Sequence, residues 1–313
     1  MWIYSSERYV LPLPAGHRFP MPKYAALRAR IARLAPERMR EPAPATDAEL
    51  CRPHAERYVA AVVGGDLDAA AQRRIGFPWS PAMVARSRHS AGATLAACRS
   101  ALEHGCGINL AGGTHHAHRD WGSGFCVFND AAVAIRALQA EHRVERVMVV
   151  DLDVHQGDGT ATMLAGDRTT FTLSLHGRRN FPFRKAASSL DVELDDGTGD
   201  AAYLATLRAA LGVALARFTP ELVIYLAGAD PYVGDRLGRL ALTKRGLAAR
   251  DRFVLETLAA RRVPVAIAMA GGYATLIEDS VDIHAATIGI ALELHAGCGA
   301  GSGSTDESRA AAC

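Results

Sequence analysis

Short apolar runs alternate with longer Ala- and Leu-rich segments along most of the chain. Five runs have the length and β-branched content of strands, at residues 108–111, 147–151, 170–175, 222–226 and 263–268. Several are almost continuously apolar, as parallel strands buried on both faces are. Helices are predicted at residues 131–141, 203–218 and 244–260. Because strands and helices alternate, we expect right-handed crossovers and an α/β fold with a parallel sheet covered by helices.

The N-terminal part of the chain has a less regular pattern. Residues 1–60 are rich in proline, arginine and short apolar groups, with one good helix candidate at residues 23–34. The rest of this stretch is typical of surface structure laid over a core that later segments form. Ser80 and Pro81 predict the start of a long helix that runs to Ala101, because proline is tolerated in the first helical turn.

The length of 313 residues would allow two domains, but no linker separates the predicted elements. We therefore expect a single domain over residues 1–296. At residues 297–313 the composition collapses to glycine, serine and alanine, which predicts a flexible tail.

The composition excludes several classes of protein and partner. With 49% hydrophobic and 22% charged residues, the chain is not disordered, collagen-like or a coiled coil. A net charge of +2 without a basic block argues against a nucleic-acid partner. No apolar run reaches the roughly 18 residues that a membrane span needs. Six cysteines without a CxxC pair, and no leader sequence, predict reduced thiols in a cytoplasmic protein.

Reactive side chains or glycines follow each predicted strand at its C-terminal end. In chain order they are Gly112-Gly113-Thr114-His115-His116, Asp151-Leu152-Asp153-Val154-His155, Ser174-Leu175-His176, Gly228-Ala229-Asp230 and Gly271-Gly272-Tyr273. In open parallel sheets, ligands bind in the crevice outside the carboxyl ends of the strands. We therefore expect these five segments to form one site.

Asp151, Asp153 and His155 occupy alternate positions, so in an extended segment their side chains share one face. A carboxylate and an imidazole two residues apart suit a borderline cation such as Zn²⁺. Asp230, at another strand end, is the candidate third ligand. Two aspartates and one histidine would leave positions open for water and substrate, as catalytic sites do. The alternative for Asp153 and His155 is a solvated strand terminus.

Further polar groups fit acid–base chemistry at the same site. His115 and His116 would each need an orienting carboxylate, and Asp151 and Asp158 are available. The phenol of Tyr273, which follows two glycines, suits stabilisation of an oxyanion, although it could also simply cover the sheet end.

Three nearby positions have weaker signals. Ser174 and Leu175 could lend oxygens to a monovalent cation beside the aspartates, or simply end a strand. Cys126 is expected to be a packed small hydrophobe, because no separate base remains to activate it.

These motifs together resemble the histone deacetylase family, in the arginase/deacetylase superfamily. The resemblance rests on residues 112–117, 124–130, 151–159, 174–176, 227–230 and 271–273, in that order and at matching spacing. Residues 180–185 and 234–238 resemble the class IV branch and its bacterial relatives. The fold implied is a single-domain arginase/deacetylase fold with an eight-stranded parallel sheet and the active site at the C-terminal strand ends.

The resemblance also implies roles for individual residues. One Zn²⁺ per chain would be held by Asp153, His155 and Asp230. His115 would be oriented by Asp151, and His116 would be oriented by Asp158 and act as the general base. Tyr273 would donate a hydrogen bond to the oxyanion. A K⁺ ion would lie near Asp151, Asp153, His155, Ser174 and Leu175, and the substrate channel would be formed by Gly124, Phe125, Gly271 and Gly272. Phe181 or Phe183 would supply the second channel aromatic.

The implied activity is zinc-dependent hydrolysis of N-acyl-lysine amides, on a protein or peptide, with acetyl or longer acyl groups. An amidohydrolase for acetylpolyamines or other small acylated amines would share the same chemistry. A ureohydrolase on the same fold would bridge two Mn²⁺ ions with a denser set of carboxylates. An inert acyl-lysine-binding scaffold would be expected to lack one or more of the metal-ligand or catalytic residues, and none of the candidates is missing from this sequence.

Overall fold

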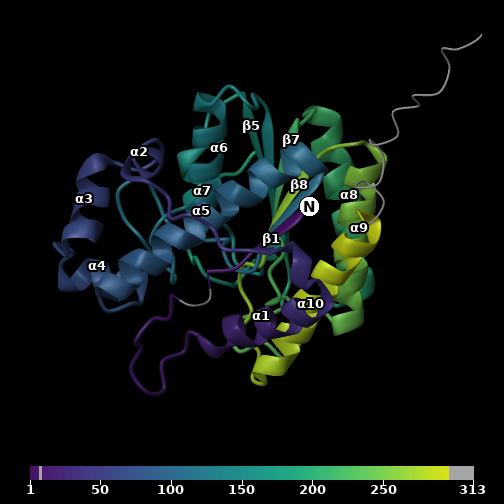
Figure 1. The fold of residues 1–313 in the computed structure, drawn as a ribbon. Coiled ribbons are helices and arrows are strands. Elements are labelled where there is room, and N and C mark those ends of the chain that lie inside the picture. The colour runs from purple at the N-terminus through teal and green to yellow at the C-terminus, as the bar shows by residue number, and fades with distance from the viewer. Residues whose placement is uncertain (7–8, 296–313) are drawn as a thin grey trace, which may run out of the picture.

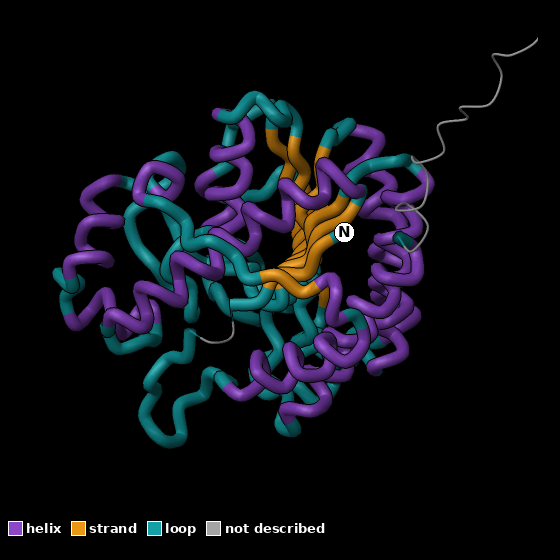
Figure 2. Tube along the Cα trace, viewed as in Figure 1, coloured by secondary structure: helices purple, strands orange, loops and turns teal. Residues whose placement is uncertain are grey.

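An eight-stranded sheet lies between two layers of helices in the computed structural model, which describes residues 1–6 and 9–295 (Figures 1 and 2). The strand order is β2-β1-β3-β8-β7-β4-β5-β6, and all neighbours pair in parallel. The strands are β1 (Trp2–Tyr4), β2 (Met39–Arg40), β3 (Cys106–Asn109), β4 (Val147–Asp151), β5 (Thr170–Gly177), β6 (Leu190–Leu194), β7 (Leu222–Leu226) and β8 (Val265–Ala268). The predicted α/β fold with one parallel eight-stranded sheet in a single domain is confirmed.

Helices cover both faces of this sheet (Figure 2). They are α1 (Pro22–Leu34), α2 (Asp47–Leu50), α3 (Glu56–Gly64), α4 (Ala69–Ile75), α5 (Pro81–His104), α6 (Asp130–Ala140), α7 (Asp158–Met163), α8 (Asp200–Arg217), α9 (Lys244–Ala260) and α10 (Ile277–Leu294), with a 3₁₀ turn at Pro36–Arg38. Apolar side chains of α1, α8, α9 and α10 pack on one face, and those of α5 and α6 pack on the other. Helices α2, α3 and α4 lie beside this sandwich (Figure 1).

Helix α5 starts and ends where its sequence predicts a boundary. The Ser80 hydroxyl accepts a hydrogen bond from the backbone N–H of Met83, and Pro81 occupies the first turn. Gly105 ends the helix in the left-handed conformation, with φ of 81°. At Gly107 on β3, a Cβ atom would lie 2.1 Å from the carbonyl oxygen of Ala97. Glycine therefore allows β3 and α5 to approach closely.

The predicted elements of the last two thirds of the chain are present, with ends that differ by up to three residues. Strands 147–151 and 222–226 and helix 244–260 match β4, β7 and α9 at both ends. The interpretation of residues 1–60 as surface structure is wrong in one respect. Strand β1 pairs with both β2 and β3, and Ile3 on it is fully buried. Strands of two or three residues carry no periodicity, so their place in a sheet depends on a distant partner.

Two further expectations concerned membrane-spanning segments and the C-terminal tail. None of the helices in residues 1–6 and 9–295 has the combined length and apolar character that crossing a bilayer requires. The predicted tail at residues 297–313 lies outside the described residues.

We expect Ile3→Ala to lower the free energy of unfolding by about 2–5 kcal/mol, because it empties a buried position between the sheet and its helices. Urea denaturation followed by circular dichroism measures this loss. Leu34→Ala, which truncates a side chain that is 58% exposed, is the matched control and should change stability by less than about 0.5 kcal/mol. Equal effects of the two substitutions would contradict the burial of Ile3 on β1.

Candidate active site

The polar segments that follow the strands meet at the carboxyl end of the parallel sheet. Strands β3, β8, β7 and β4 are neighbours in that order, and their C-terminal ends lead into the four segments that carry most candidate residues. A cavity of about 740 Å³ opens there, and its lining includes His115, His116, Asp153, His155, Asp230 and Tyr273. Four of the five segments expected to form one site thus contribute side chains to one cavity, whereas Ser174, Leu175 and His176 do not line it.

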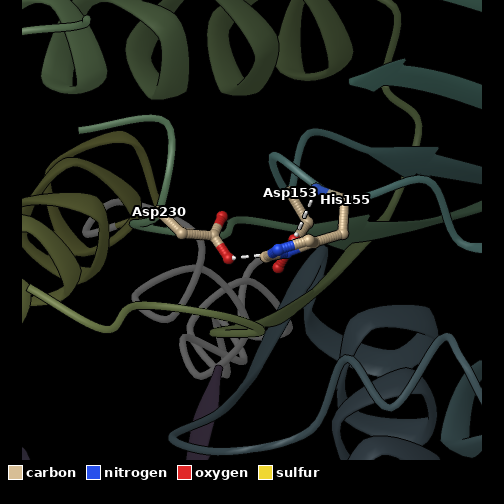
Figure 3. A group of neighbouring side chains, drawn as sticks. All are labelled: Asp153, His155 and Asp230. Carbon is tan, nitrogen blue, oxygen red and sulfur yellow. Dashed lines mark hydrogen bonds and ion pairs between the residues drawn. The ribbon is translucent and has the colours of Figure 1, made fainter. Parts of the chain in front are cut away.

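Asp153, His155 and Asp230, which line the cavity at buried positions, form a compact group of possible metal ligands (Figure 3). One ligand atom from each lies within 4.8 Å of the others, and all three residues are buried. The Nδ1 atom of His155 is 2.9 Å from Asp153 Oδ1 and 3.3 Å from Asp230 Oδ2. In residues 1–6 and 9–295 this is the one group of three such side chains that meets this spacing.

Backbone groups hold the two carboxylates close together despite their like charge. The N–H of Val154 donates to Asp230 Oδ1 at 2.9 Å, and the N–H of Gly271 donates to Asp153 Oδ2 at 2.8 Å. A Cβ atom at Gly271 would lie 1.9 Å from Asp230 Oδ2. The glycine after β8 therefore leaves the space that the carboxylate occupies.

The electrostatics of this group fit a divalent cation. Burial, together with the neighbouring Asp153, raises the pKa of Asp230 to about 7. Burial would lower the pKa of His155, but the neighbouring carboxylates of Asp153 and Asp230 outweigh it and raise that pKa to about 10. The buried Oδ2 of Asp230 has no hydrogen-bond partner. A cation among these two carboxylates and one imidazole would satisfy that oxygen and offset the like charges.

Two histidine–aspartate pairs lie beside the possible ligands. The Nδ1 of His115 donates to Asp151 Oδ2 at 2.7 Å, and the Nδ1 of His116 donates to Asp158 Oδ1 at 2.7 Å. All four side chains are buried. Each carboxylate holds a proton on Nδ1 of its histidine, so Nε2 is the nitrogen left to exchange a proton.

The two imidazoles differ in their electrostatic surroundings. Burial lowers the pKa of both, but Asp151 and Asp153 outweigh this effect and raise the pKa of His115 to about 9. For His116, burial and the neighbouring His115 together outweigh Asp158 and lower the pKa to about 4. Adjacent histidines with the same type of carboxylate partner are therefore suited to different charge states.

Asp130 positions the loop that carries both histidines, and the sequence analysis missed this function. Its carboxylate accepts hydrogen bonds from the backbone N–H groups of Gly113 and Thr114, each at 2.8 Å, and from the hydroxyl of Thr94 at 2.6 Å. The side chain is fully buried at the start of α6. Its place directly after Asn129, within a motif of the family resemblance, was the available signal.

Tyr273 is held in the cavity by contacts to its backbone. Its N–H donates to Asp235 Oδ2 at 2.6 Å, and the Nζ of buried Lys23 donates to the carbonyl of Gly272 at 3.2 Å. Burial raises the pKa of the Tyr273 phenol well above its usual value. The phenol is therefore a neutral hydrogen-bond donor at physiological pH. Lys23 and Asp235 lie far from Tyr273 along the chain, so no local pattern indicated their contacts with this loop.

Aromatic rings line the approach to the histidines. The rings of Phe181 and His116 have centroids 4.9 Å apart, and those of Phe125 and Tyr273 are 6.0 Å apart. Gly124 lies between them, because a Cβ there would be 2.6 Å from His116 Cδ2 and 3.3 Å from Phe181 Cε1. Both candidates for the second aromatic line the cavity, but Phe181 contacts His116, whereas Phe183 is 86% exposed.

The residues expected around K⁺ lie on neighbouring strands. Asp151 at the end of β4 is the register partner of Ser174 on β5, and Leu175 follows Ser174 on the same strand. The Ser174 hydroxyl is 2.9 Å from His176 Nδ1.

Two residues near Asp158 add to the sequence interpretation. His118 places its Nε2 at 3.2 Å from Asp158 Oδ2 and stacks on Trp121 with ring centroids 3.7 Å apart. It thus supports the carboxylate that orients His116. Cys126 is buried, and burial raises the pKa of its thiol well above the usual value, which agrees with packing rather than nucleophilic chemistry.

Comparison with known proteins agrees with this geometry. The family model for the histone deacetylase domain matches residues 17–288. The chain belongs to the histone deacetylase family. This is a family of amide hydrolases, and the predicted resemblance is confirmed.

Relatives and solved structures add detail. The chain is 46% identical over 279 residues to an uncharacterized protein of Picosynechococcus, covering 88% of this chain and 93% of the relative. It is 38% identical over 202 residues to histone deacetylase 2 of Arabidopsis thaliana, covering 62% of this chain and 52% of the plant protein. The chain thus spans about half the length of that relative.

The fold matches that of an HDAC homolog from Aquifex aeolicus, with a TM-score of 0.80 and 24% identity over 94% of this chain and 84% of that one. An HDAC homolog complexed with SAHA matches with a TM-score of 0.79 and 24% identity, over 95% and 84% of the two chains.

Asp230→Ala should weaken zinc binding by roughly 100-fold. Zinc sites of four ligands bind with about 10–16 kcal/mol in all, so each ligand contributes a few kcal/mol. Competition against a chromogenic chelator measures the affinity. Asp195→Ala is the control, since that carboxylate is 77% exposed and pairs with Arg178. If Asp230→Ala bound zinc as tightly as the control, Asp230 would not be a ligand.

Proposed function

We propose that the protein hydrolyses N-acyl-lysine amides in a zinc-dependent reaction, with one Zn²⁺ per chain. The observation that carries this proposal is the convergence, on one cavity, of three metal-ligand side chains, two buried histidine–aspartate pairs and a tyrosine. Membership of the histone deacetylase family supports the reaction class. A ureohydrolase with two metal ions would need more carboxylates than the three-residue group supplies.

In the proposed mechanism, Asp153, His155 and Asp230 hold the zinc ion, which would polarise the amide carbonyl and acidify a water molecule. His116, with Nδ1 bound to Asp158, accepts the proton of the attacking water at Nε2. The same nitrogen then returns a proton to the departing lysine amine. His115, held by Asp151, stabilises the developing negative charge. The hydroxyl of Tyr273 donates a hydrogen bond to the oxyanion.

The remaining site residues have supporting roles in this proposal. Gly124, Phe125, Gly271 and Phe181 line the cavity and would form the walls of the substrate channel, whereas Gly272, also expected there, does not line it. Asp151, Asp153, His155, Ser174 and Leu175 would hold a K⁺ ion, which would brace the end of β4. The class IV relationship stays a prediction that rests on residues 180–185 and 234–238.

The proposed location is the cytoplasm. Cys51, Cys98, Cys106 and Cys126 are all free, and all but Cys51 are buried. Reduced, packed thiols of this kind are typical of a reducing compartment.

A substrate panel tests the function directly. We expect turnover of peptides that carry acetyl-lysine or lauroyl-lysine, and loss of that turnover when the metal is removed or when SAHA is added. Liquid chromatography of the deacylated peptide is the measurement. Acetylspermidine and acetylputrescine form the comparison arm. Hydrolysis of these amines without hydrolysis of any peptide would replace the proposal with the small-amide alternative. Zinc binding without turnover of any amide would indicate an acyl-lysine-binding scaffold.

Tyr273→Phe should lower kcat by about 10²–10³-fold, because the oxyanion loses one hydrogen-bond donor. Zinc affinity should be unchanged, since the tyrosine is not a ligand. Tyr232→Phe is the matched control, because the Tyr232 hydroxyl contacts Asp279 at 3.4 Å and does not line the cavity. Near wild-type turnover of Tyr273→Phe would remove the phenol from the mechanism.

A further inference from the structure

Arginines dominate the charged lining of the cavity above its buried floor. Among the described lining residues, the carboxylates are Asp153 and Asp230, which are both buried and assigned to the metal. The lining also contains seven arginines. Six of them are exposed and are called the rim arginines here: Arg18, Arg73, Arg74, Arg179, Arg236 and Arg239.

The rim arginines come from four separate parts of the chain. Arg18 precedes α1, Arg73 and Arg74 lie in the last turn of α4, Arg179 follows β5, and Arg236 and Arg239 lie in the segment after β7. The overall charge of the protein is only +2. The positive charge at the cavity therefore results from tertiary convergence and not from a basic stretch of sequence.

Most of this charge has no acidic partner. No carboxylate within residues 1–6 and 9–295 forms an ion pair with Arg18, Arg73, Arg74 or Arg236. Arg74 lies over the ring of Trp121, at 5.0 Å from its centroid, and donates to the carbonyl of Gly122.

Arg236 likewise binds a neutral group: it donates to the carbonyl of Tyr273 at 3.1 Å. Arg179 and Arg239 share a single carboxylate, that of Asp196, at 3.9 and 3.3 Å. Within the part of the chain that the structure describes, the six rim arginines thus form ion pairs with a single carboxylate.

From this charge distribution we propose that the preferred substrate is an acyl-lysine within an acidic peptide segment, a proposal that rests on the function proposed above. Guanidinium groups bind carboxylates in a bidentate geometry, and a cleft lined by one sign of charge concentrates ligands of the opposite sign. The same field repels cationic acetylpolyamines and lysine-rich segments such as histone tails. Acidic side chains beside the acyl-lysine meet the rim arginines while the acyl group enters the cavity.

Three acetyl-lysine peptides of equal length test this surface. They carry Glu, Gln or Lys at the two positions on each side of the acetyl-lysine. We expect kcat/KM to fall in the order Glu, Gln, Lys, with about a tenfold step from Glu to Gln that lies mostly in KM. The advantage of the Glu peptide should largely disappear between about 20 mM and 500 mM NaCl, because exposed charges are screened by salt.

A double variant, Arg18→Gln with Arg73→Gln, should remove most of the preference for the Glu peptide and leave kcat for the Gln peptide unchanged. Neither side chain contacts the proposed catalytic groups. Arg168→Gln is the matched control, because Arg168 is also exposed but lies just before β5, at the N-terminal end of the strands. This control should keep the full preference.

The outcomes separate the surface proposal from the proposed function. Equal cleavage of all three peptides, without salt dependence, overturns the acidic-substrate proposal and leaves lysine deacylation standing. Hydrolysis of acetylspermidine but of no peptide overturns both. A single-stranded oligonucleotide that inhibits at lower concentration than the Glu peptide, and loses this effect in the double variant, would assign the rim arginines to nucleic acid and overturn the proposal.

Discussion

The close approach of Asp153 and Asp230 in a buried environment is the constraint on which the site depends. Two carboxylates at this spacing repel each other, and burial strengthens that repulsion because little water screens it. The fold offsets this cost with backbone N–H groups from Val154 and Gly271 and with the imidazole of His155. One carboxylate oxygen still has no hydrogen-bond partner. A site built in this way is suited to a cation.

The groups proposed to be catalytic depend on the same arrangement of strands. Because β3, β8, β7 and β4 are neighbours and all run in parallel, the loops after them converge at one sheet edge. Buried residues outside the chemistry then hold those loops in place. Asp130 binds the backbone of the histidine loop, and Asp235 and Lys23 bind the backbone on either side of the Gly272–Tyr273 peptide bond. The precision of the site therefore comes from hydrogen bonds to the backbone as much as from the reactive side chains.

The buried floor of the cavity and its arginine rim influence two different properties of the protein, the type of reaction and the choice of substrate. The floor is nearly closed to solvent, so its hydrogen bonds are strong and set the reaction type. The rim arginines are exposed, so each contributes little energy by itself and their summed field influences which substrates arrive. The family relationship concerns the floor, whereas the rim is the part that would distinguish this chain's substrates from lysine-rich ones.

The sequence by itself determined the α/β class, several long elements and the candidate residues for the site. Local patterns carry that information: β4, β7 and α9 are continuous periodic segments, and Asp153 and His155 follow a strand at alternate positions. Only the tertiary structure decided that β1 enters the sheet, that Asp130, Asp235 and Lys23 hold the site loops, and that arginines from four segments meet at one opening. These features join residues far apart in the chain, and no local periodicity or spacing encodes such contacts.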